Sequence, residues 1–590
     1  MLIVKTKFKI PFLLCLLALI GWTSFDLYTR SLAALLWGFR PLVLFAALWA
    51  TWILLRYKSL WRTPFQKKNL GLATLSGVLL GLGFPGWLPL PFLMLLAFAP
   101  LLYLEKRIAQ NSEKPAFGAV FKYTFHAFVV WNILSTFWIA NSALAAGVFA
   151  IWVNSALMTL PFVLYHQTRR ILPRLGFTPL LAYWLTFEYL HYHWALNYPW
   201  LTLGNAFAQF PAWVQWYEWT GVFGGSLWIL LVNILIFKLI EKNSKRQLVR
   251  LSALIVLPIA VSLVRYFTFS EKGDAVEIVV VQPNYEPHYE EPLISEAAKL
   301  QHCIDLAAKQ LSENTAYLVL PETVFGFAET HQLSQYETFL RLREWMQEYP
   351  KLKIVTGLSA YRIFEPDEPL SAATRTDTSR TGAVIHYEMF NAAVQLDAKS
   401  GEIPLHKKSK LVPGPESFPF QQALFFLKPI VAYFGGTTAG LGKEPQPMLF
   451  KSELGQIAPL ICYESVFGEY LTFFVRKGAQ AFFIMTNDGW WDHTPGHRQH
   501  LYFASLRAIE TRRSIARAAN TGISAFINQR GDILQHSKYD EPIALKSSIQ
   551  LSTAGTFYTR WGDMAARLSL FASIIFALNT FVRSIVKKEQ

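Results

Sequence analysis

Apolar stretches long enough to cross a membrane recur through the first 270 residues and once more near the end of the chain. A helix needs about 20 apolar residues to cross a bilayer, and about ten stretches meet this length: residues 10–27, 34–55, 70–86, 88–104, 117–140, 147–166, 176–194, 219–240, 250–268 and 563–583. The first follows a basic start, as in a signal peptide, but no small-residue cleavage site follows it. We therefore expect it to be retained, in a polytopic α-helical membrane bundle.

Lysine and arginine are concentrated in alternate loops between these stretches. Three lysines precede the first span, and basic clusters follow the second, fourth, sixth and eighth, whereas residues 195–218 contain neither residue type. Cytoplasmic loops carry such an excess of positive charge. The pattern predicts that both chain ends are cytoplasmic and that residues 274–555 lie outside. These loops carry much of the excess that gives the net charge of +15, so this charge does not indicate a nucleic-acid partner.

Composition separates the two parts of the chain. Charged residues make up only 16% of the whole, against roughly 25% in ordinary globular domains, but the deficit lies outside residues 274–555. The three cysteines, Cys15, Cys303 and Cys462, are too few and too scattered for a disulfide framework. We divide the chain into residues 1–66 with two helices, a bundle over 67–270, a soluble domain over 274–555, and a last span with its tail over 556–590.

The soluble part alternates strand and helix patterns, which predicts a layered α/β domain. Strands are expected at 276–282, 316–320, 352–357, 384–397, 457–461, 481–486, 523–529 and 544–551, and helices at 293–312, 333–347 and 498–519, with an exposed loop at 362–382.

Two features of the membrane part suggest more than a scaffold. The loop from His193 to Trp219 is aromatic and almost uncharged, which fits either an interfacial aromatic belt or a surface that dips into the outer leaflet and grips acyl chains. Glu188 lies within a predicted span, where a carboxylate is costly unless it faces the bundle interior. Glu188 is therefore a candidate site residue.

Cys462 follows the short apolar strand 457–461, and a helix-like pattern begins at Ser465. A nucleophile at such a strand-to-helix turn has rigid support and can face backbone N–H groups at the helix start. The alternative is that Cys462 is a small buried hydrophobic residue.

Two charged residues occupy related places. Glu322 ends a predicted strand, and Lys408 stands in a loop bounded by glycine and proline. Ligands in open α/β sheets gather at the carboxyl ends of strands, so Glu322, Lys408 and Cys462 can converge. Taken singly, Glu322 also suits a helix N-cap and Lys408 a solvated surface position.

Several motifs resemble those of one family. They are Pro321-Glu322, Lys408-x-x-Leu-Val-Pro-x-x-Glu416, Cys462-Tyr463-Glu464, Thr486-Asn-Asp-Gly-Trp490, Arg507 with Glu510 and Arg513, Asn520-Thr-Gly522, Tyr198-Pro-Trp-Leu-x-Leu-Gly-Asn205 and Trp219-Thr-Gly-Val. The soluble part resembles the nitrilase superfamily, and residues 70–583 resemble the apolipoprotein N-acyltransferase family.

The resemblance implies a nitrilase-like αββα sandwich with a Glu–Lys–Cys triad. Cys462 would be the nucleophile, Glu322 the general base, and Lys408 the cation that stabilises the oxyanion. Glu416, Tyr463, Glu464 and Trp490 would support the site or the substrate.

The chain departs from the family pattern at three places. Gly414-Pro415 replaces a Phe-Gly pair before Glu416, so we expect a stiffer or differently posed loop. The family's tryptophan after the first strand has no clear counterpart, and Tyr285 or Tyr289 is a candidate lid in its place. The two spans in residues 1–66 are additional to the usual eight.

Two further patterns resemble motifs that bind a metal ion or a nucleotide, but each lacks the secondary structure that such a motif needs. His493, His497 and His500 have metal-like spacing, but Pro495-Gly496 interrupts the helix that would align them, so we expect no metal. Gly435-Gly436 and the glycines at 440 and 442 lack the strand and helix of a nucleotide-binding loop. No cofactor is expected.

The resemblance predicts a multi-pass enzyme of the bacterial inner membrane with its catalytic domain in the periplasm. It would move a fatty acyl chain from a phospholipid, through a Cys462 thioester, to the α-amino group of the N-terminal diacylglyceryl-cysteine of an apolipoprotein. A membrane-tethered amidase acting on a small C–N substrate and a non-enzymatic receptor or transporter are the alternatives.

Overall fold

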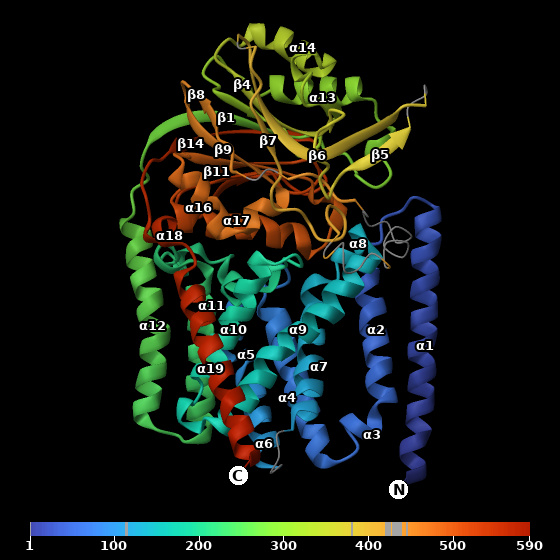
Figure 1. Ribbon diagram of the computed structural model, residues 1–590, viewed down its shortest axis with the longest axis vertical. Coiled ribbons are helices and arrows are strands. Elements are labelled where there is room, and N and C mark those ends of the chain that lie inside the picture. Colours follow the sequence, from blue (N-terminus) through green and yellow to red (C-terminus); the bar gives the residue numbers. More distant parts are fainter. Residues whose placement is uncertain are drawn as a thin grey trace.

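The computed structural model describes residues 2–111, 116–378, 382–399, 401–418, 420, 426, 439–443 and 446–589, with side chains from residue 9 to 586. A helical bundle forms one half and a two-sheet domain the other (Figure 1). Both chain ends lie at the end of the bundle farthest from the sheets. This agrees with the arrangement that the basic loops predict.

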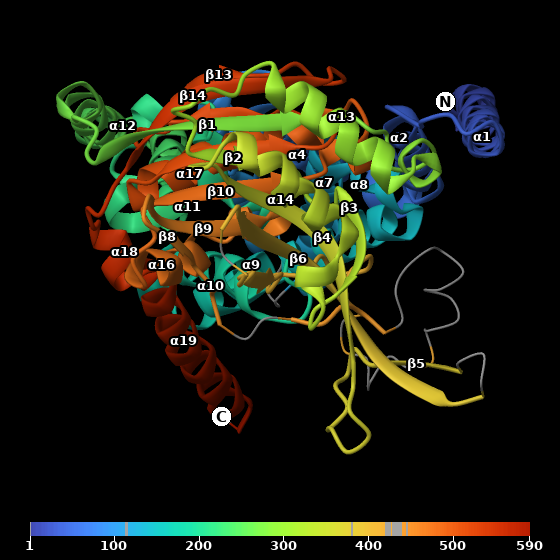
Figure 2. The same cartoon turned by 90° about the horizontal axis from the view of Figure 1, so that it is seen from above.

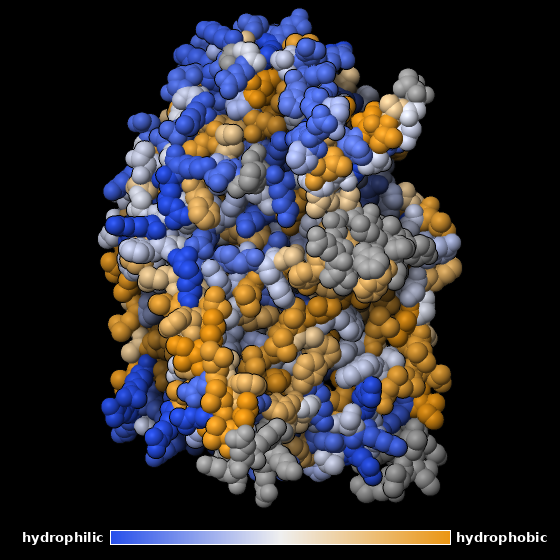
Figure 3. Space-filling model, viewed as in Figure 1, coloured by the Kyte–Doolittle hydropathy of each residue, from blue (hydrophilic) through white to orange (hydrophobic). Residues whose placement is uncertain are grey.

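The long helices of the bundle run between the sheet domain and the opposite end. They are α1 (Leu2–Leu32), α2 (Arg40–Leu55), α4 (Pro64–Gly83), α7 (Phe117–Thr136), α9 (Leu144–Ile171), α10 (Thr178–His193), α11 (Tyr217–Glu241), α12 (Lys245–Thr268) and α19 (Met564–Glu589). Among the described residues, six helices are both long and apolar enough to span a membrane, and α2 is a shorter apolar helix. On the face seen in Figure 3, apolar side chains predominate over the middle of this half, with hydrophilic ones above and below. The chain is a multi-pass membrane protein.

The predicted span at 88–104 is not one continuous helix. It is divided into η1 (Pro91–Leu93), α5 (Met94–Ala97) and α6 (Ala99–Gln110). Backbone groups at this break are bonded by Asn233 of α11, whose Oδ1 accepts from the N–H of Phe98 at 2.8 Å and whose Nδ2 donates to the Met94 carbonyl at 2.8 Å. A broken helix is tolerated inside a membrane where neighbouring helices satisfy the freed groups.

The aromatic segment after α10 is largely buried in the protein. It folds as short 3₁₀ turns, η3 (Pro199–Leu201), η4 (Leu203–Phe207) and η5 (Pro211–Trp213). Trp200 is only 2% exposed, and its indole N–H donates to Gln499 of the sheet domain at 2.6 Å. The segment is therefore packed between the two halves, which its uncharged composition allows.

The sheet domain contains two sheets. The larger has the order β14-β1-β2-β4-β6-β5, with β3 on β4 and β7 on β6, and the smaller has the order β13-β12-β11-β10-β9-β8. Their bounds are β1 (Asp274–Gln282), β2 (Tyr317–Val319), β3 (Phe325–Glu329), β4 (Lys353–Ile363), β5 (Arg375–Thr378), β6 (Val384–Asp397), β7 (Leu405–Lys407), β8 (Phe450–Ser452), β9 (Gly455–Ile461), β10 (Ala481–Thr486), β11 (Ser514–Ala519), β12 (Ala525–Ile527), β13 (Ile533–His536) and β14 (Ile543–Leu551).

Helices cover both outer faces of this pair of sheets. Helices α13 (Glu296–Ala308) and α14 (Glu337–Trp345) cover the larger sheet, and α16 (Gly468–Arg476) and α17 (Pro495–Thr511) lie between the smaller sheet and the bundle. Seen from above, α13 and α14 lie over the sheets and the β5–β6 ribbon extends away from them (Figure 2). The αββα sandwich is confirmed.

Two predicted elements of this domain are wrong. The helix expected over 498–519 ends at Thr511, because Arg512 takes a left-handed backbone (φ 51°), and residues 514–519 form the buried strand β11 parallel to β10. Alanine and arginine favour helices, but pairing within the sheet outweighs this preference. The loop expected at 362–382 is largely exposed but contains strand β5, which pairs with β6.

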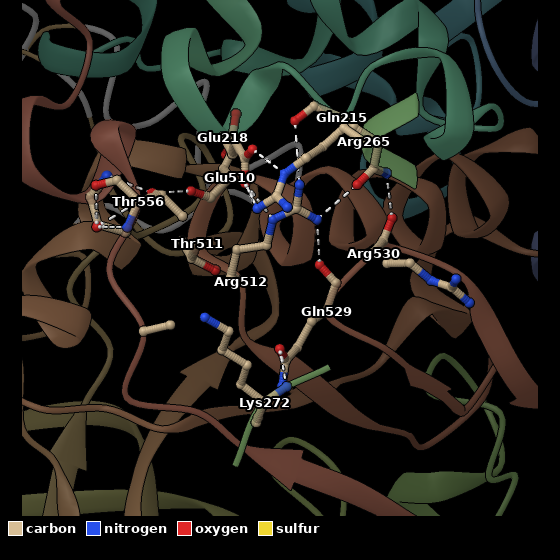
Figure 4. Close-up of polar contacts among 12 residues, drawn as sticks. Gln215, Glu218, Arg265, Lys272, Glu510, Thr511, Arg512, Gln529, Arg530 and Thr556 are labelled. Atoms are coloured by element: carbon tan, nitrogen blue, oxygen red, sulfur yellow. Dashed lines mark hydrogen bonds and ion pairs between the residues drawn. The ribbon is translucent and has the colours of Figure 1, made fainter. Parts of the chain in front are cut away.

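A buried ion cluster joins the two halves. The Arg512 Nε donates to Glu218 at the start of α11 at 2.7 Å, and Arg265 of α12 donates to the same carboxylate at 2.7 Å. Arg512 also donates to the Gln215 side chain and to the Gln529 carbonyl (Figure 4). Charge-assisted bonds with several partners hold a side chain in one geometry.

The turn between α1 and α2 also reaches the sheet domain. The Gly38 N–H donates to the Asp492 carboxylate at 2.7 Å, and Asn141 donates to the carbonyls of Gly38 and Trp491 at 3.1 Å each. The N-terminal helix pair thus contacts the loop that follows β10.

Candidate active site

Cys462 begins the turn that follows β9 and leads into α16. Its backbone is left-handed (φ 48°), a conformation that is uncommon for residues other than glycine. Such strain is found at functional sites, where the surrounding structure enforces it. The side chain is 7% exposed, so this thiol is held at the edge of the smaller sheet with little contact with solvent.

Glu322 follows β2 of the larger sheet. Its Oε1 accepts from the Asn391 side chain at 2.7 Å and from Lys408 Nζ at 3.0 Å, and its Oε2 accepts from the Asn487 backbone N–H at 3.0 Å. A Cβ on Gly357 would lie 2.7 Å from the Glu322 Cα, so only glycine fits beside this residue. Glu322 is therefore a fixed carboxylate and not a helix cap.

Lys408 follows β7, and its side chain is 1% exposed. Its ammonium donates to Glu416 at 2.8 Å as well as to Glu322, and Glu416 also accepts from the Val412 N–H at 2.8 Å and from Asn391 at 3.1 Å. The Gly414-Pro415 departure thus still places Glu416 beside Lys408. Asn391 bridges the two carboxylates.

Electrostatics link these groups to Cys462. Burial raises the pKa of the Cys462 thiol well above its ordinary value, Glu322 raises it further, and Lys408 opposes both effects. Burial also lowers the pKa of Lys408, but the carboxylates of Glu322 and Glu416 outweigh it, so this pKa is raised. The site therefore contains a permanent ammonium and a neutral thiol.

Glu464 and Tyr463 have different roles. The buried Glu464 accepts from the N–H of Ile461 at 2.9 Å and of Ser409 at 2.7 Å, which ties the Cys462 turn to the Lys408 loop. Burial raises the pKa of Glu464, but His406 and these N–H groups outweigh it and hold the pKa below its ordinary value. The Tyr463 hydroxyl donates to the Asn197 carbonyl of the membrane half at 3.1 Å.

A second buried network lies behind Cys462. The His500 ring bonds the Cys462 carbonyl at 3.2 Å and the Asp488 carboxylate at 3.0 Å, and Asp488 accepts from Arg517 at 2.7 Å. Burial raises the pKa of Asp488, but Arg517 and His500 outweigh it and the pKa is lowered. His500 thus has a positioning contact with the Cys462 turn.

Trp490 is 42% exposed, and its ring lies edge-on to His288, 5.0 Å between centroids. Tyr285 is buried, with its N–H donating to Asn520 and its carbonyl accepting from Thr521. It is therefore not an exposed lid. The loop after β1 presents His288, and not Tyr285, to Trp490.

The histidines with metal-like spacing form no common site. The His493 ring stacks on Tyr539 with 4.7 Å between centroids, and the His497 ring lies tilted against Tyr539 at 4.5 Å. Burial lowers the pKa of His497 to about 3. Across the described part of the chain, no three His, Cys, Asp or Glu residues are grouped to hold a metal ion. Gly435-Gly436 lie outside the described residues.

The sequence analysis missed Asn391, His406 and the bridging role of His500. Each is a buried polar residue, and such residues nearly always have a partner inside the protein. An asparagine in the middle of β6 was thus a usable signal, but its partners lie 69 and 25 residues away.

Comparison with known proteins gives one consistent result. Residues 76–235 match the family model of the apolipoprotein N-acyltransferase N-terminal domain, and residues 278–558 match that of carbon-nitrogen hydrolases. An apolipoprotein N-acyltransferase of Chlorobaculum tepidum is 27% identical, covering 87% of this chain and 96% of that protein, and one of Geobacter metallireducens is 27% identical, covering 87% and 95%. A solved amidase of Nesterenkonia is 18% identical with a TM-score of 0.33, covering 50% of this chain and 97% of the amidase.

Proposed function

Because the chain belongs to the apolipoprotein N-acyltransferase family, we propose that Cys462 carries the transferred acyl group as a thioester. The acyl donor is a membrane phospholipid, and the acceptor is the α-amino group of the N-terminal diacylglyceryl-cysteine of an apolipoprotein. The observation that supports this most is the buried cluster of Glu322, Lys408 and Glu416, which is electrostatically linked to the Cys462 thiol.

In the first half of the reaction, Glu322 accepts the thiol proton as the sulfur attacks the ester carbonyl. The C–S bond forms, and negative charge develops on the carbonyl oxygen beside the Lys408 ammonium. A fixed donor of this kind contributes about 3–4 kcal/mol in comparable sites. The tetrahedral species then releases the lysophospholipid alkoxide, which takes the proton from Glu322.

In the second half, the neutral amine of the acceptor attacks the thioester. Glu322 accepts the amine proton, the C–N bond forms, and the sulfur leaves as a thiolate that is reprotonated by Glu322. Two steps through a reactive thioester replace one difficult step. Glu416 and Asn391 keep Lys408 and Glu322 in place throughout, and Glu464 and Tyr463 hold the turn.

The placement in the membrane follows from both substrates being anchored in lipid. We propose that the enzyme lies in the bacterial inner membrane, with residues 274–555 in the periplasm, the bundle at 67–270, the additional pair of spans within 1–66, and the last span and tail within 556–590. Removing an acyl chain from the bilayer costs about 0.8 kcal/mol per CH₂, so a site at the membrane edge avoids that cost.

Trapping the intermediate tests this proposal. Purified enzyme is incubated with phospholipid vesicles without acceptor and analysed by intact mass spectrometry. We expect one long-chain fatty acyl group on Cys462, removed by hydroxylamine, and none on Cys462→Ala or Glu322→Gln. A Cys303→Ala variant is the matched control and should acylate normally. A hydrolysed small amide with no acylation would instead support an amidase.

A further inference from the structure

The loop that follows β10 makes three contacts with the candidate active site. The Asn487 N–H donates to Glu322 Oε2 at 3.0 Å, and the Asp488 carboxylate bonds the His500 ring at 3.0 Å. The Trp491 ring lies edge-on to the same imidazole, with 5.5 Å between centroids. His500 in turn bonds the first carbonyl of the turn that follows β9. The position of this loop therefore affects both sheets at the site.

The end of this loop is held in an unfavourable backbone conformation. Asp492 has φ 60° and ψ −177°, a region that is almost exclusive to glycine and that persists only where surrounding contacts enforce it. The Asp492 carboxylate makes two such contacts. Its Oδ1 accepts from the N–H of His493 at 2.6 Å, and its Oδ2 accepts from the N–H of Gly38 at 2.7 Å. The first bond lies within the loop, and the second comes from the turn between α1 and α2.

Another side chain joins the same two segments. Asn141 in α8 (Ile139–Ser142) donates through Nδ2 to the carbonyls of Gly38 and Trp491 at 3.1 Å each. The Trp491 ring also packs on Trp138, with 4.8 Å between centroids. The turn after α1, the short helix α8 and the loop after β10 thus meet at the end of the bundle that faces the sheet domain (Figure 1).

The turn between α1 and α2 is itself fixed. The Arg40 guanidinium pairs with Asp26, and Arg40 Nη1 donates to the Trp37 carbonyl at 3.2 Å. Farther along α2, the Trp49 indole N–H donates to the buried His126 of α7 at 3.0 Å. A backbone N–H on such a turn makes a strong, charge-assisted bond to a carboxylate. The helix pair is therefore able to hold the loop after β10 in one place.

We propose that the helix pair α1–α2 is a positioning element for the active site, and that Asp492 is the positioning residue through which it acts. The turn holds the loop, and the loop holds Glu322 through the Asn487 N–H and the Cys462 turn through His500. The effect on the acylation rate rests on the proposed function, whereas the contact between the turn and the loop does not. The two additional N-terminal helices thereby support the reaction of the sheet domain.

The substitution Asp492→Gly separates positioning from folding. It removes the acceptor of the Gly38 N–H, but it also places glycine where the backbone favours it, so the Tm should stay close to that of the wild type. The rate constant of Cys462 acylation at saturating phospholipid vesicles should fall about tenfold, with the half-saturating lipid concentration unchanged. Asp540→Gly, at another aspartate with a positive φ (62°), is the matched control and should leave the rate unchanged.

Hydrogen–deuterium exchange measures the loop directly and needs no reaction. In the full-length enzyme in lipid nanodiscs, exchange of the peptide that covers residues 487–494 should be several times faster in Asp492→Gly and in Asn141→Ala than in the wild type. Ser142→Ala is the control for Asn141→Ala, because the Ser142 hydroxyl donates to the Ile139 carbonyl within α8. It should leave this exchange unchanged, and exchange of β10 should not change in any variant.

Unchanged exchange in this loop would overturn the proposal. An Asp492→Gly enzyme that acylates at the wild-type rate, or that loses Tm and rate together, would overturn it as well. If the wild-type enzyme forms no thioester, the proposed function fails, and the exchange result alone then decides whether the turn holds the loop.

Discussion

The thiol of Cys462 lies in surroundings that oppose its ionisation. Burial and the nearby Glu322 carboxylate both raise its pKa, and Lys408 only partly compensates. Many cysteine nucleophiles depend on a depressed pKa, whereas here the proton must be removed during attack. In the proposed reaction Glu322 is the base that takes this proton, and Lys408 opposes the rise in thiol pKa.

We therefore predict that alkylation of Cys462 by iodoacetamide is slow at pH 7 and rises about tenfold per pH unit up to and beyond pH 9, because only the thiolate reacts. Lys408→Met removes the cation that lowers this pKa, so the rate at any given pH should fall. Alkylation is measured by peptide mass spectrometry in a Cys15→Ser, Cys303→Ser background. Lys407→Met is the matched control, and a fast, pH-independent rate would contradict the prediction.

The Asp488 network makes a different prediction, about acid stability. The pKa of Asp488 is lower in the folded protein than its ordinary value, so the unfolded chain takes up the proton first as the pH falls. The stabilisation is complete above about pH 4 and is lost below it. We expect Tm to fall steeply below pH 4 in the wild type and less steeply in Asp488→Asn, as measured by thermal denaturation from pH 3 to 7.

Asp488→Asn also leaves Arg517 without its carboxylate, so Tm at pH 7 should be lower than in the wild type. The exposed Asp367→Asn serves as control. Parallel acid profiles for wild type and Asp488→Asn would refute this assignment.

At the scale of elements, the junction between α17 and β11 serves two purposes. The left-handed Arg512 ends the helix, and the guanidinium bonds Glu218 of the bundle (Figure 4). Glu218 receives a second arginine, Arg265, from the last turn of α12. This cluster fixes how the sheet domain is oriented on the bundle, and therefore how the Cys462 site faces the membrane.

We predict that Arg512→Gln separates two activities. Acylation from phospholipid vesicles should fall about tenfold or more, because small displacements of a reacting group are costly. Hydrolysis of a soluble short-chain ester, which needs only the triad, should stay within about twofold of wild type. Both rates are measured on the same detergent-solubilised preparation.

Arg530→Gln is the matched control, since Arg530 is partly exposed and pairs with Asp532 on the same face. It should affect neither rate. Equal loss of both activities in Arg512→Gln would mean that this residue supports folding and not orientation.

For the whole molecule, a single apolar core joins the bundle to the smaller sheet. Leu460 and Phe467, which flank the Cys462 turn, belong to the same cluster as Trp138 and Trp200. The other two clusters pack α13 and α14 on the larger sheet and fill the space between the sheets. The two halves therefore form a continuous body, with the Cys462 turn at their junction.

Topology is the prediction at this scale. In a cysteine-free background, a cysteine at Asp377 in β5 should react with a membrane-impermeant maleimide on intact spheroplasts. One at Asn243, in the turn between α11 and α12, should react only after lysis, because the basic residues around it favour the cytoplasm. The reverse labelling pattern would invert the proposed orientation.

The elements with a strong local signal could be predicted from the sequence. The long apolar helices, the alternating strands and the strand-to-cysteine turn follow from hydrophobic period and length alone. The division of the predicted span 88–104 into η1, α5 and α6 depends on bonds from Asn233. The strand β11, whose residues favour a helix, depends on pairing with the neighbouring strand β10. Local propensity does not contain that information.

For the site, the sequence by itself determined which residue types stand at strand ends, namely Glu322, Lys408 and Cys462. The tertiary structure alone decided that Asn391 bridges two carboxylates, that His500 supports the Cys462 turn, and that Glu188 accepts from the Leu203 N–H. The hydrophobic period of the sequence shows which residues lie on the buried face of their own helix or strand. Contacts between distant elements arise only when those elements pack, because a hydrogen bond or ion pair needs both partners in place.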